Sequence, residues 1–288
     1  MKAAALFLLA GCGHSLAAQL DARIHEQRDA ELVAVAYVEL AGGETLLREA
    51  DRRVHAASTM KLPVMMEVYR RAAAGELSLD EPVRIDNHFE SLVDRSVYEL
   101  DPGDDADPQP YQKIGNEAPL RWLVERMIVR SSNLATNLVI QLVGAEAVTR
   151  MCRALGAQAI EVRRGVEDSK AHAAGMDNTT TARDLMVLLR AIGERRVPGA
   201  DAMIDVLSHQ ELNEGIPAGL PPLVRVAHKT GSFGGICHDA ALVLPEHGGA
   251  YVLVVMTRGI ADEKQAEHLI ADLSRIIWKH REQRGTGS

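Results

Sequence analysis

The two ends of this chain carry strand patterns, whereas its middle carries helix patterns. "LVAVAYVEL" (32–40) is a nearly continuous apolar run of strand length, and "TLLREA" (45–50) follows the turn residues "AGGE". Near the other end, 224–232, 238–245 and 251–259 are apolar or alternating runs joined by glycine-rich turns. Strands so far apart in sequence predict one antiparallel sheet built from both ends of the chain.

Helices are expected between and after these strands. The stretch 86–118, with "DPGDDADPQP" at its centre, is too rich in proline and aspartate for regular structure and predicts a surface segment that narrows or covers the cleft edge. The fold class is therefore predicted as α/β (α+β), an antiparallel sheet flanked by terminal helices with an inserted all-helical region. The expected helices lie at about 59–74, 119–129, 133–144, 144–155, 181–192, 201–210 and 261–284.

Composition narrows the function. The 288 residues carry a net charge of −8 without a long basic run, and aromatic residues make up only 3%. Nucleic acid and anionic membrane are therefore not expected as partners. We expect a single catalytic domain at 19–284, with a sheet part at about 22–58 and 217–284, a helical part at about 59–216 and a short tail at 285–288.

The N-terminus has the layout of a secretory signal. A lysine precedes a short apolar run, and small residues follow, so that a signal peptide at 1–18 is predicted. Two processing routes remain open. "SLA" at 15–17 suits a signal peptidase, whereas "LAGC" at 9–12 resembles a bacterial lipobox that would attach lipid to Cys12. Either route predicts export to the periplasm or beyond it, and the signal-peptidase route is favoured because a lipobox this near Met1 leaves a short apolar region.

The remaining cysteines and the histidines predict no metal centre. Cys152 and Cys237 are expected to be two free buried thiols, with a disulfide as the alternative in an oxidising compartment. Neither H-E-x-x-H nor another metal-binding spacing occurs, and we expect no cofactor.

Three short motifs carry candidate chemistry. The first is "ASTMKLP" (57–63), which places Ser58 and Lys61 three residues apart at a helix start. The second is Ser131-Ser132-Asn133 in a turn between two helices, and the third is Lys229-Thr230-Gly231-Ser232 on a C-terminal strand. Each motif has a purely structural alternative. The serines are typical helix caps, and Lys229 could be a charge that protects a strand edge.

Taken together and in this order, the motifs resemble the S-x-x-K, S-x-N and K-T-G boxes of penicillin-recognising serine enzymes, the class A β-lactamases and penicillin-binding proteins. "STMKLPV" and Asn137 in "SSNLATN" extend the resemblance, which covers roughly residues 25–284. It implies the β-lactamase/transpeptidase-like fold, a mechanism without a cofactor, and a monomer.

The resemblance also implies the roles of the residues. Ser58 would be the nucleophile, and Lys61, one helical turn away, its base, with a pKa lowered by burial and by the charge of Lys229. Ser131 would pass a proton to the leaving nitrogen, and Asn133 would hold the side-chain amide of the substrate. The backbone N–H groups of Ser58 and Ser232 would bind the oxyanion. The substrate carboxylate would be held by Lys229, Thr230 and Ser232, with Gly231 completing the third box.

The resemblance weakens at the step that releases the acyl group. Class A β-lactamases use a loop glutamate as the deacylating base, and Glu167 in "RRGVEDSKAHAAG" falls at that place. However, Lys170 and Ala171 stand where leucine and asparagine are expected, and Ser132 stands where aspartate is usual. The alternative for Glu167 is a solvated acid paired with Arg163 or Arg164.

Three functions follow from these observations. The first is a β-lactamase that confers antibiotic resistance by opening β-lactam rings through an acyl-serine. The second is a D-Ala-D-Ala carboxypeptidase or related penicillin-binding peptidase or esterase that acts on acyl-peptides and releases its acyl group poorly. The third is a periplasmic binding protein with this fold and no catalysis.

Overall fold

The computed structural model describes residues 15–285 of the chain. Its centre is a five-stranded antiparallel sheet in the order β2-β1-β11-β10-β9, so that strands from both ends of the chain share one sheet, as predicted. β1 pairs with β11 along its whole length. The strands are β1 (Leu32–Glu39), β2 (Thr45–Arg48), β9 (Arg225–Phe233), β10 (Ile236–Leu244) and β11 (Tyr251–Arg258).

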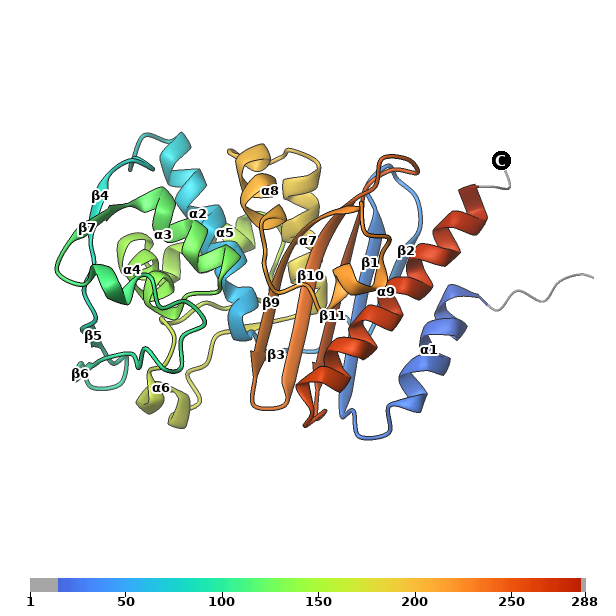
Figure 1. Ribbon diagram of the computed structural model, residues 1–288, viewed down its shortest axis with the longest axis horizontal. Coiled ribbons are helices and arrows are strands. Elements are labelled where there is room, and N and C mark those ends of the chain that lie inside the picture. Colours follow the sequence, from blue (N-terminus) through green and yellow to red (C-terminus); the bar gives the residue numbers. More distant parts are fainter. Residues whose placement is uncertain (1–14, 286–288) are drawn as a thin grey trace, which may run out of the picture.

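Helices cover both faces of this sheet. The terminal helices α1 (Leu16–Glu26) and α9 (Glu263–Gly285) lie on one face, and α7 (Ala182–Gly193) with the helical region lies on the other (Figure 1). Alternate residues of β1 therefore enter two different cores: Val35 packs with the terminal helices and Ala36 with the helical region. A strand buried on both faces reads as a continuous apolar run, which explains "LVAVAYVEL".

The helical region stands beside β9, the edge strand of the sheet (Figure 1). The predicted helices are present, but the segment expected from residue 59 begins with a 3₁₀ turn, η1 (Ala57–Met60), before the α-helix proper. The remaining helices of this region are α2 (Lys61–Ala73), α3 (Leu120–Val129), α4 (Asn133–Val143), α5 (Ala145–Ala154), α6 (Ser169–Ala173) and α8 (Ala200–Ser208).

The segment 86–118 is not wholly irregular, so that part of the prediction is wrong. It contains a small hairpin of β5 (Phe89–Glu90) and β6 (Val97–Tyr98), and a 3₁₀ turn, η2 (Tyr111–Lys113). Its end enters β7 (Glu117–Pro119), which pairs with β4 (Pro82–Arg84). Two- and three-residue strands are set by their pairing partners and leave no periodic pattern in the sequence.

Helix α1 begins at Leu16, within the predicted signal peptide 1–18, and its buried residues Leu16, Leu20 and Ile24 pack into the same core as α9. Residues 1–14, which include Cys12, lie outside the described residues. Within residues 15–285, no helix is long and apolar enough to cross a membrane. Cys152 and Cys237 are both free and buried, as expected.

Candidate active site

Ser58 lies in the 3₁₀ turn that runs directly into α2. The residue before this turn is Ala56, and no side chain caps the turn, so the helix-cap alternative for Ser58 is wrong. Ala57 has a φ of 44°, a left-handed conformation that is uncommon for a residue with a side chain. Such backbone strain gathers at functional sites, and here it lies next to the candidate nucleophile.

Lys61 is the first residue of α2, and it is completely buried. Its Nζ donates hydrogen bonds to the carbonyl oxygen of Ser131 (2.6 Å), to Ser131 Oγ (3.1 Å) and to Asn133 Oδ1 (2.8 Å). Since these bonds use all three N–H donors of the ammonium, no hydrogen bond joins Lys61 to Ser58 within the described residues. Burial lowers the pKa of the Lys61 amine to about 7, as the mechanism requires, although Asp105 and Glu167 oppose this shift.

Ser131 lies in the turn between α3 and α4 with a φ of 59°. Its Oγ accepts hydrogen bonds from Lys61 Nζ and from Lys229 Nζ, both at 3.1 Å. A serine hydroxyl has two acceptor positions and one proton. When both amines donate, the acceptor positions are filled, so the Ser131 proton remains available for donation to another group. Its neighbour Ser132 is the N-cap of α4, as the structural alternative proposed.

Lys229 is completely buried on β9, which excludes the interpretation as an exposed strand-edge charge. Burial lowers its pKa well below the usual range, and the nearby charge of Lys61 acts in the same direction. One lysine therefore lowers the pKa of the other, as predicted, but the pKa that is lowered in this way is that of Lys229 and not that of Lys61.

Gly231 allows β9 to approach the Ser58 turn. A Cβ added there would lie 2.8 Å from the backbone nitrogen of Ser58 and 2.9 Å from that of Thr59. No side chain fits in this space, so the third box needs its glycine.

The structure brings most of the predicted residues to one place. Thr230 and Gly231 line a neighbouring cavity of about 90 Å³, which also reaches Ser232. The resemblance implies that Thr230 binds the substrate, but Thr230 lines this small cavity and not the main cavity that holds Ser58. The main cavity, of about 400 Å³, is lined by four predicted residues: Ser58, Asn133, Glu167 and Ser232.

Glu167 reaches this cavity from the loop before α6. Its Oε1 accepts a hydrogen bond from Asn133 Nδ2 (2.7 Å), and the same asparagine accepts one from Lys61, so a chain of contacts links Lys61 to Glu167. Glu167 is exposed, as expected of a loop acid, but partial burial of its carboxyl raises the pKa above its usual value. The expected arginine partners bind elsewhere: Arg163 to Glu161 and Arg164 to Asp177. The arginine-paired alternative is therefore wrong.

The loop that carries Glu167 is held by other residues. Asn137 accepts a hydrogen bond from the Val166 nitrogen (2.6 Å) and donates one to the Val166 oxygen (3.1 Å), so its amide is occupied in fixing the loop. The Lys170 amine turns away to Asp94 (2.7 Å). Ala171 is completely buried. The amide expected at residue 171 is therefore replaced by a methyl group.

Two histidines and an aromatic ring form one wall of the main cavity. His55 stacks on Phe233 with ring centroids 4.9 Å apart, and His172 meets the same ring edge-on at 5.4 Å. The histidines and Asp177 are close enough to hold a metal ion. However, His55 Nδ1 accepts a hydrogen bond from a backbone N–H (3.0 Å), which leaves the proton on Nε2, and Asp177 is neutralised by Arg164 (2.7 Å). Arg164 and His172 are both hydrogen-bonded to Asp177, at 2.7 Å and 2.9 Å, so this carboxylate already has two partners. The cluster was not predicted from the sequence.

Asp105 was not predicted from the sequence as part of the site, yet its carboxylate accepts a hydrogen bond from the Asn133 nitrogen at 2.8 Å. An acid within a proline-rich segment gives no periodic signal, so its partner across the fold could not be read from the sequence.

The sequence profile of the β-lactamase enzyme family matches residues 15–281, which is most of the chain. The chain belongs to the β-lactamase enzyme family. A β-lactamase from Streptomyces fradiae is 28% identical over 272 residues, which cover 88% of this chain and 82% of the relative. The site geometry and this membership identify the protein as a class A β-lactamase-like serine hydrolase.

Solved structures of the family have the same fold. A β-lactamase from Sphaerobacter thermophilus has a TM-score of 0.78 and 28% identity, and covers 93% of this chain and 97% of its own. PBP-A has a TM-score of 0.80 and 25% identity, with 93% and 96% coverage. The similarity therefore extends to a protein named as a penicillin-binding protein as well as to β-lactamases.

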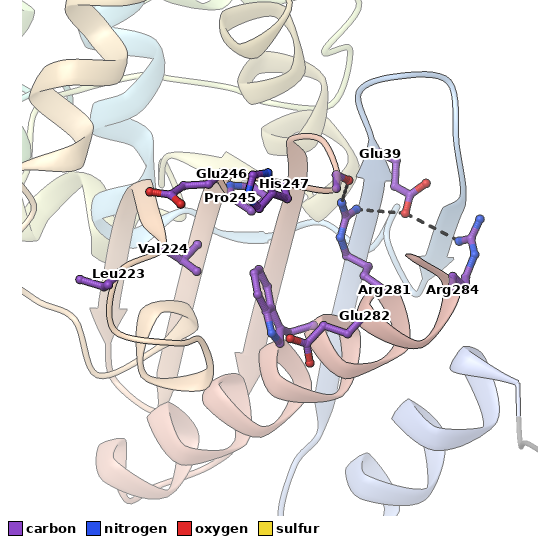
Figure 2. Close-up of a pocket in the computed structure, with 11 residues that line it drawn as sticks. Glu39, Leu223, Val224, Pro245, Glu246, His247, Arg281, Glu282 and Arg284 are labelled. Carbon is purple, nitrogen blue, oxygen red and sulfur yellow. Dashed lines mark hydrogen bonds and ion pairs between the residues drawn. The ribbon is translucent and has the colours of Figure 1, made fainter. Parts of the chain in front are cut away.

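A second and larger cavity of this family member, of about 680 Å³, lies between α9 and the β10–β11 turn (Figure 2). Arg281 in its lining donates hydrogen bonds to Glu39 (3.0 Å) and to the Gly248 oxygen (2.6 Å). Trp278 and Val224 are among its apolar lining residues. None of the three boxes contributes to this cavity, so size alone does not indicate the active site.

Proposed function

We propose that the protein opens β-lactam rings through an acyl-Ser58 intermediate. The observation that supports this most strongly is the placement of two buried amines, Lys61 and Lys229, on the single hydroxyl of Ser131 next to the Ser58 turn. Burial of both amines disfavours their charged forms, and the Ser131 proton is available for donation. An uncharged amine and a proton donor are the requirements of amide-bond cleavage by a serine.

Acylation uses these groups in sequence. Lys61, with its lowered pKa, takes the Ser58 proton after shifting from its resting contacts, and Ser58 Oγ attacks the lactam carbonyl. The backbone N–H groups of Ser58 and Ser232 stabilise the oxyanion. The carbon–nitrogen bond then breaks, the nitrogen receives the proton of Ser131, and Ser131 regains a proton from the Lys61 ammonium, which lies 3.1 Å from its Oγ.

Release of the acyl group depends on Glu167. The carboxylate takes a proton from a water molecule as the water oxygen attacks the ester carbonyl. The ester carbon–oxygen bond then breaks, and the proton held by Glu167 returns to Ser58 Oγ. A second candidate function, a penicillin-binding peptidase with slow release, is favoured by one observation, the buried methyl of Ala171 where an amide is expected. PBP-A offers a parallel, since one of its mutants is described as an acyl-enzyme complex with penicillin G.

Intact mass spectrometry during incubation with penicillin G separates the candidates. A transient adduct with continued penicillin loss supports a β-lactamase, whereas a persistent adduct supports the peptidase. No adduct would contradict both and leave a binding protein. The Ser58→Ala variant is the control, and an adduct on that variant would refute Ser58 as the nucleophile.

The Glu167→Gln variant tests the second half of the reaction. We expect acylation to proceed at close to the native rate, because the amide oxygen still accepts the hydrogen bond from Asn133. Release should slow by about a hundredfold or more, the usual contribution of a general base, so the adduct persists for longer. Unchanged turnover would exclude Glu167 as the base.

We further propose that this activity operates outside the cytoplasm and protects the cell from β-lactams. Expression of the full chain in a susceptible bacterium should raise the penicillin concentration needed to stop growth, and expression of the Ser58→Ala variant should not. An equal effect of both proteins would contradict this role.

A further inference from the structure

Asp105 connects the irregular segment before η2 to the start of α4. It is 9% exposed, and its Oδ2 accepts hydrogen bonds from the backbone nitrogens of Asn133 (2.8 Å) and Leu134 (2.9 Å) and from Ser132 Oγ (3.2 Å). Asn133 and Leu134 are the first two residues of the helix, so their N–H groups have no acceptor within it. A carboxylate at this end also interacts favourably with the helix dipole.

The segment that carries Asp105 is itself anchored. Asp105 Oδ1 accepts a hydrogen bond from the Asp107 nitrogen (3.0 Å), and the Tyr111 hydroxyl donates to Oδ2 (3.1 Å). Asp107 is buried in an ion pair with Arg126 of α3. The carboxylate is therefore held in place by both the loop and the helix before the Ser131 turn.

The residue that Asp105 holds occupies the centre of the catalytic contacts. Asn133 is the first residue of α4, and its side chain links Lys61 to Glu167. The backbone N–H of the same residue is fixed by Asp105. A change in this bond would move the side-chain amide and the adjoining turn at Ser131, whose hydroxyl contacts both lysines.

The second box cannot supply this carboxylate itself. Ser132 is the N-cap of α4, and its hydroxyl accepts a hydrogen bond from the Ala135 nitrogen (3.2 Å), which leaves the N–H groups of Asn133 and Leu134 to another acceptor. We infer that Asp105 supplies from a distant loop the carboxylate that the S-S-N box lacks, and that it is a positioning residue for acylation. This inference rests on the proposed function, because it assigns Asn133 and Ser131 to that reaction.

Two substitutions and their combination test the inference. The limiting rate of acylation by a fluorescent penicillin should fall about tenfold or more in Asp105→Ala, because two helix N–H groups lose a charged acceptor. Ser132→Asp alone should also slow acylation, because it places a second carboxylate against Asp105. In the double variant, the new carboxylate caps α4 from the N-cap position, and the rate should return to within about threefold of native.

The controls separate positioning from general damage. Asp86→Ala removes an exposed acid from the same long segment and should change the rate by less than about twofold. Asp105→Asn keeps the side-chain volume but removes the charge. Circular dichroism at the temperature of the acylation assay checks that each variant is folded. A native rate in Asp105→Ala and Asp105→Asn, or a double variant no faster than Asp105→Ala, would overturn the inference.

Amide hydrogen exchange tests the same inference without a measurement of enzyme activity. The N–H groups of Asn133 and Leu134 should lose protection in Asp105→Ala, and Leu134 should regain it in the double variant. Absence of a penicillin adduct on the native protein would refute the proposed function, whereas native protection of both amides in Asp105→Ala would refute the role of Asp105.

Discussion

At the scale of single residues, the protonation state of two buried amines controls whether Ser58 can be activated. Burial lowers the pKa of Lys61 to about 7, and the pKa of Lys229 is lowered by burial and by its neighbour. Both amines share one acceptor on Ser131, so protonation of one disfavours protonation of the other. Near neutral pH the pair can therefore hold an uncharged amine beside a charged one.

The pH dependence of acylation follows from this arrangement. The base must be uncharged, and a lowered pKa means that Lys61 loses its proton as the pH rises through about 7. The acylation rate, measured by stopped-flow mixing with penicillin, should therefore rise about tenfold per pH unit below pH 7 and level off above it. A lysine with an ordinary pKa stays charged from about pH 5 to about pH 9. An acylation rate that is constant over this range would contradict Lys61 as the base.

At the scale of elements, the close approach of β9 to η1 brings two backbone N–H groups near each other. The Cα of Gly231 lies where a Cβ would press on the nitrogens of Ser58 and Thr59. The next residue, Ser232, supplies the second proposed oxyanion donor. Oxyanion donors act only when they are placed within a few tenths of an ångström of the developing charge, so the separation of these elements is part of the catalytic geometry.

Gly231→Ala should therefore reduce acylation more than stability. The added methyl forces β9 away from η1, and we expect a loss of about a hundredfold in acylation rate, similar to the loss of one oxyanion donor. Gly248→Ala is a matched control in the β10–β11 turn, where φ is 84° and no atom lies within 4 Å of the added group. It should cost about 1 kcal/mol of folding free energy through backbone strain and leave acylation near native. Equal acylation rates in both variants would contradict the close-approach argument.

The same elements show what a sequence can predict. The sheet strands and the long helices were predicted because their burial repeats with a regular period over many residues. The two-residue partners β3 (Val54–His55) and β8 (Thr179–Thr180), and the five-residue α6, were missed because their positions are fixed by contacts across the fold. The three boxes located the site through resemblance.

The details inside the site depend on packing that the sequence does not encode locally. The resemblance paired Ser58 with Lys61 as its base, but in the structure the turn at Ser131 and Asn133 supplies the hydrogen-bond partners of the amine. Asp105 likewise acts on a helix 28 residues further along the chain. Long-range partners of this kind become visible only when the fold is assembled.

At the scale of the whole molecule, both ends of the described residues, 15–285, are part of the folded core. β1 lies between β2 and β11 in the sheet, and α1 packs against α9 through Leu16, Leu20 and Ile24. Leu16 is 2% exposed, and Ser15 caps α1 by accepting a hydrogen bond from the Ala18 nitrogen (3.3 Å). Cleavage after residue 17 would remove the cap and one of the three buried residues of the helix.

The two processing routes therefore predict proteins of different stability. Loss of Leu16 and of the Ser15 cap should lower the free energy of unfolding by about 3 kcal/mol, from the burial of one leucine and one helix cap. Urea unfolding of a chain that starts at residue 12, as the lipobox route leaves it, and of one that starts at residue 18 measures this difference. Leu16→Ala in the longer chain isolates the side-chain part. The signal-peptidase route, which the sequence alone favoured, would cut into α1. We therefore now expect processing at Cys12, which retains all of α1, and equal stability of the two chains would remove the reason to prefer that route over cleavage after residue 17.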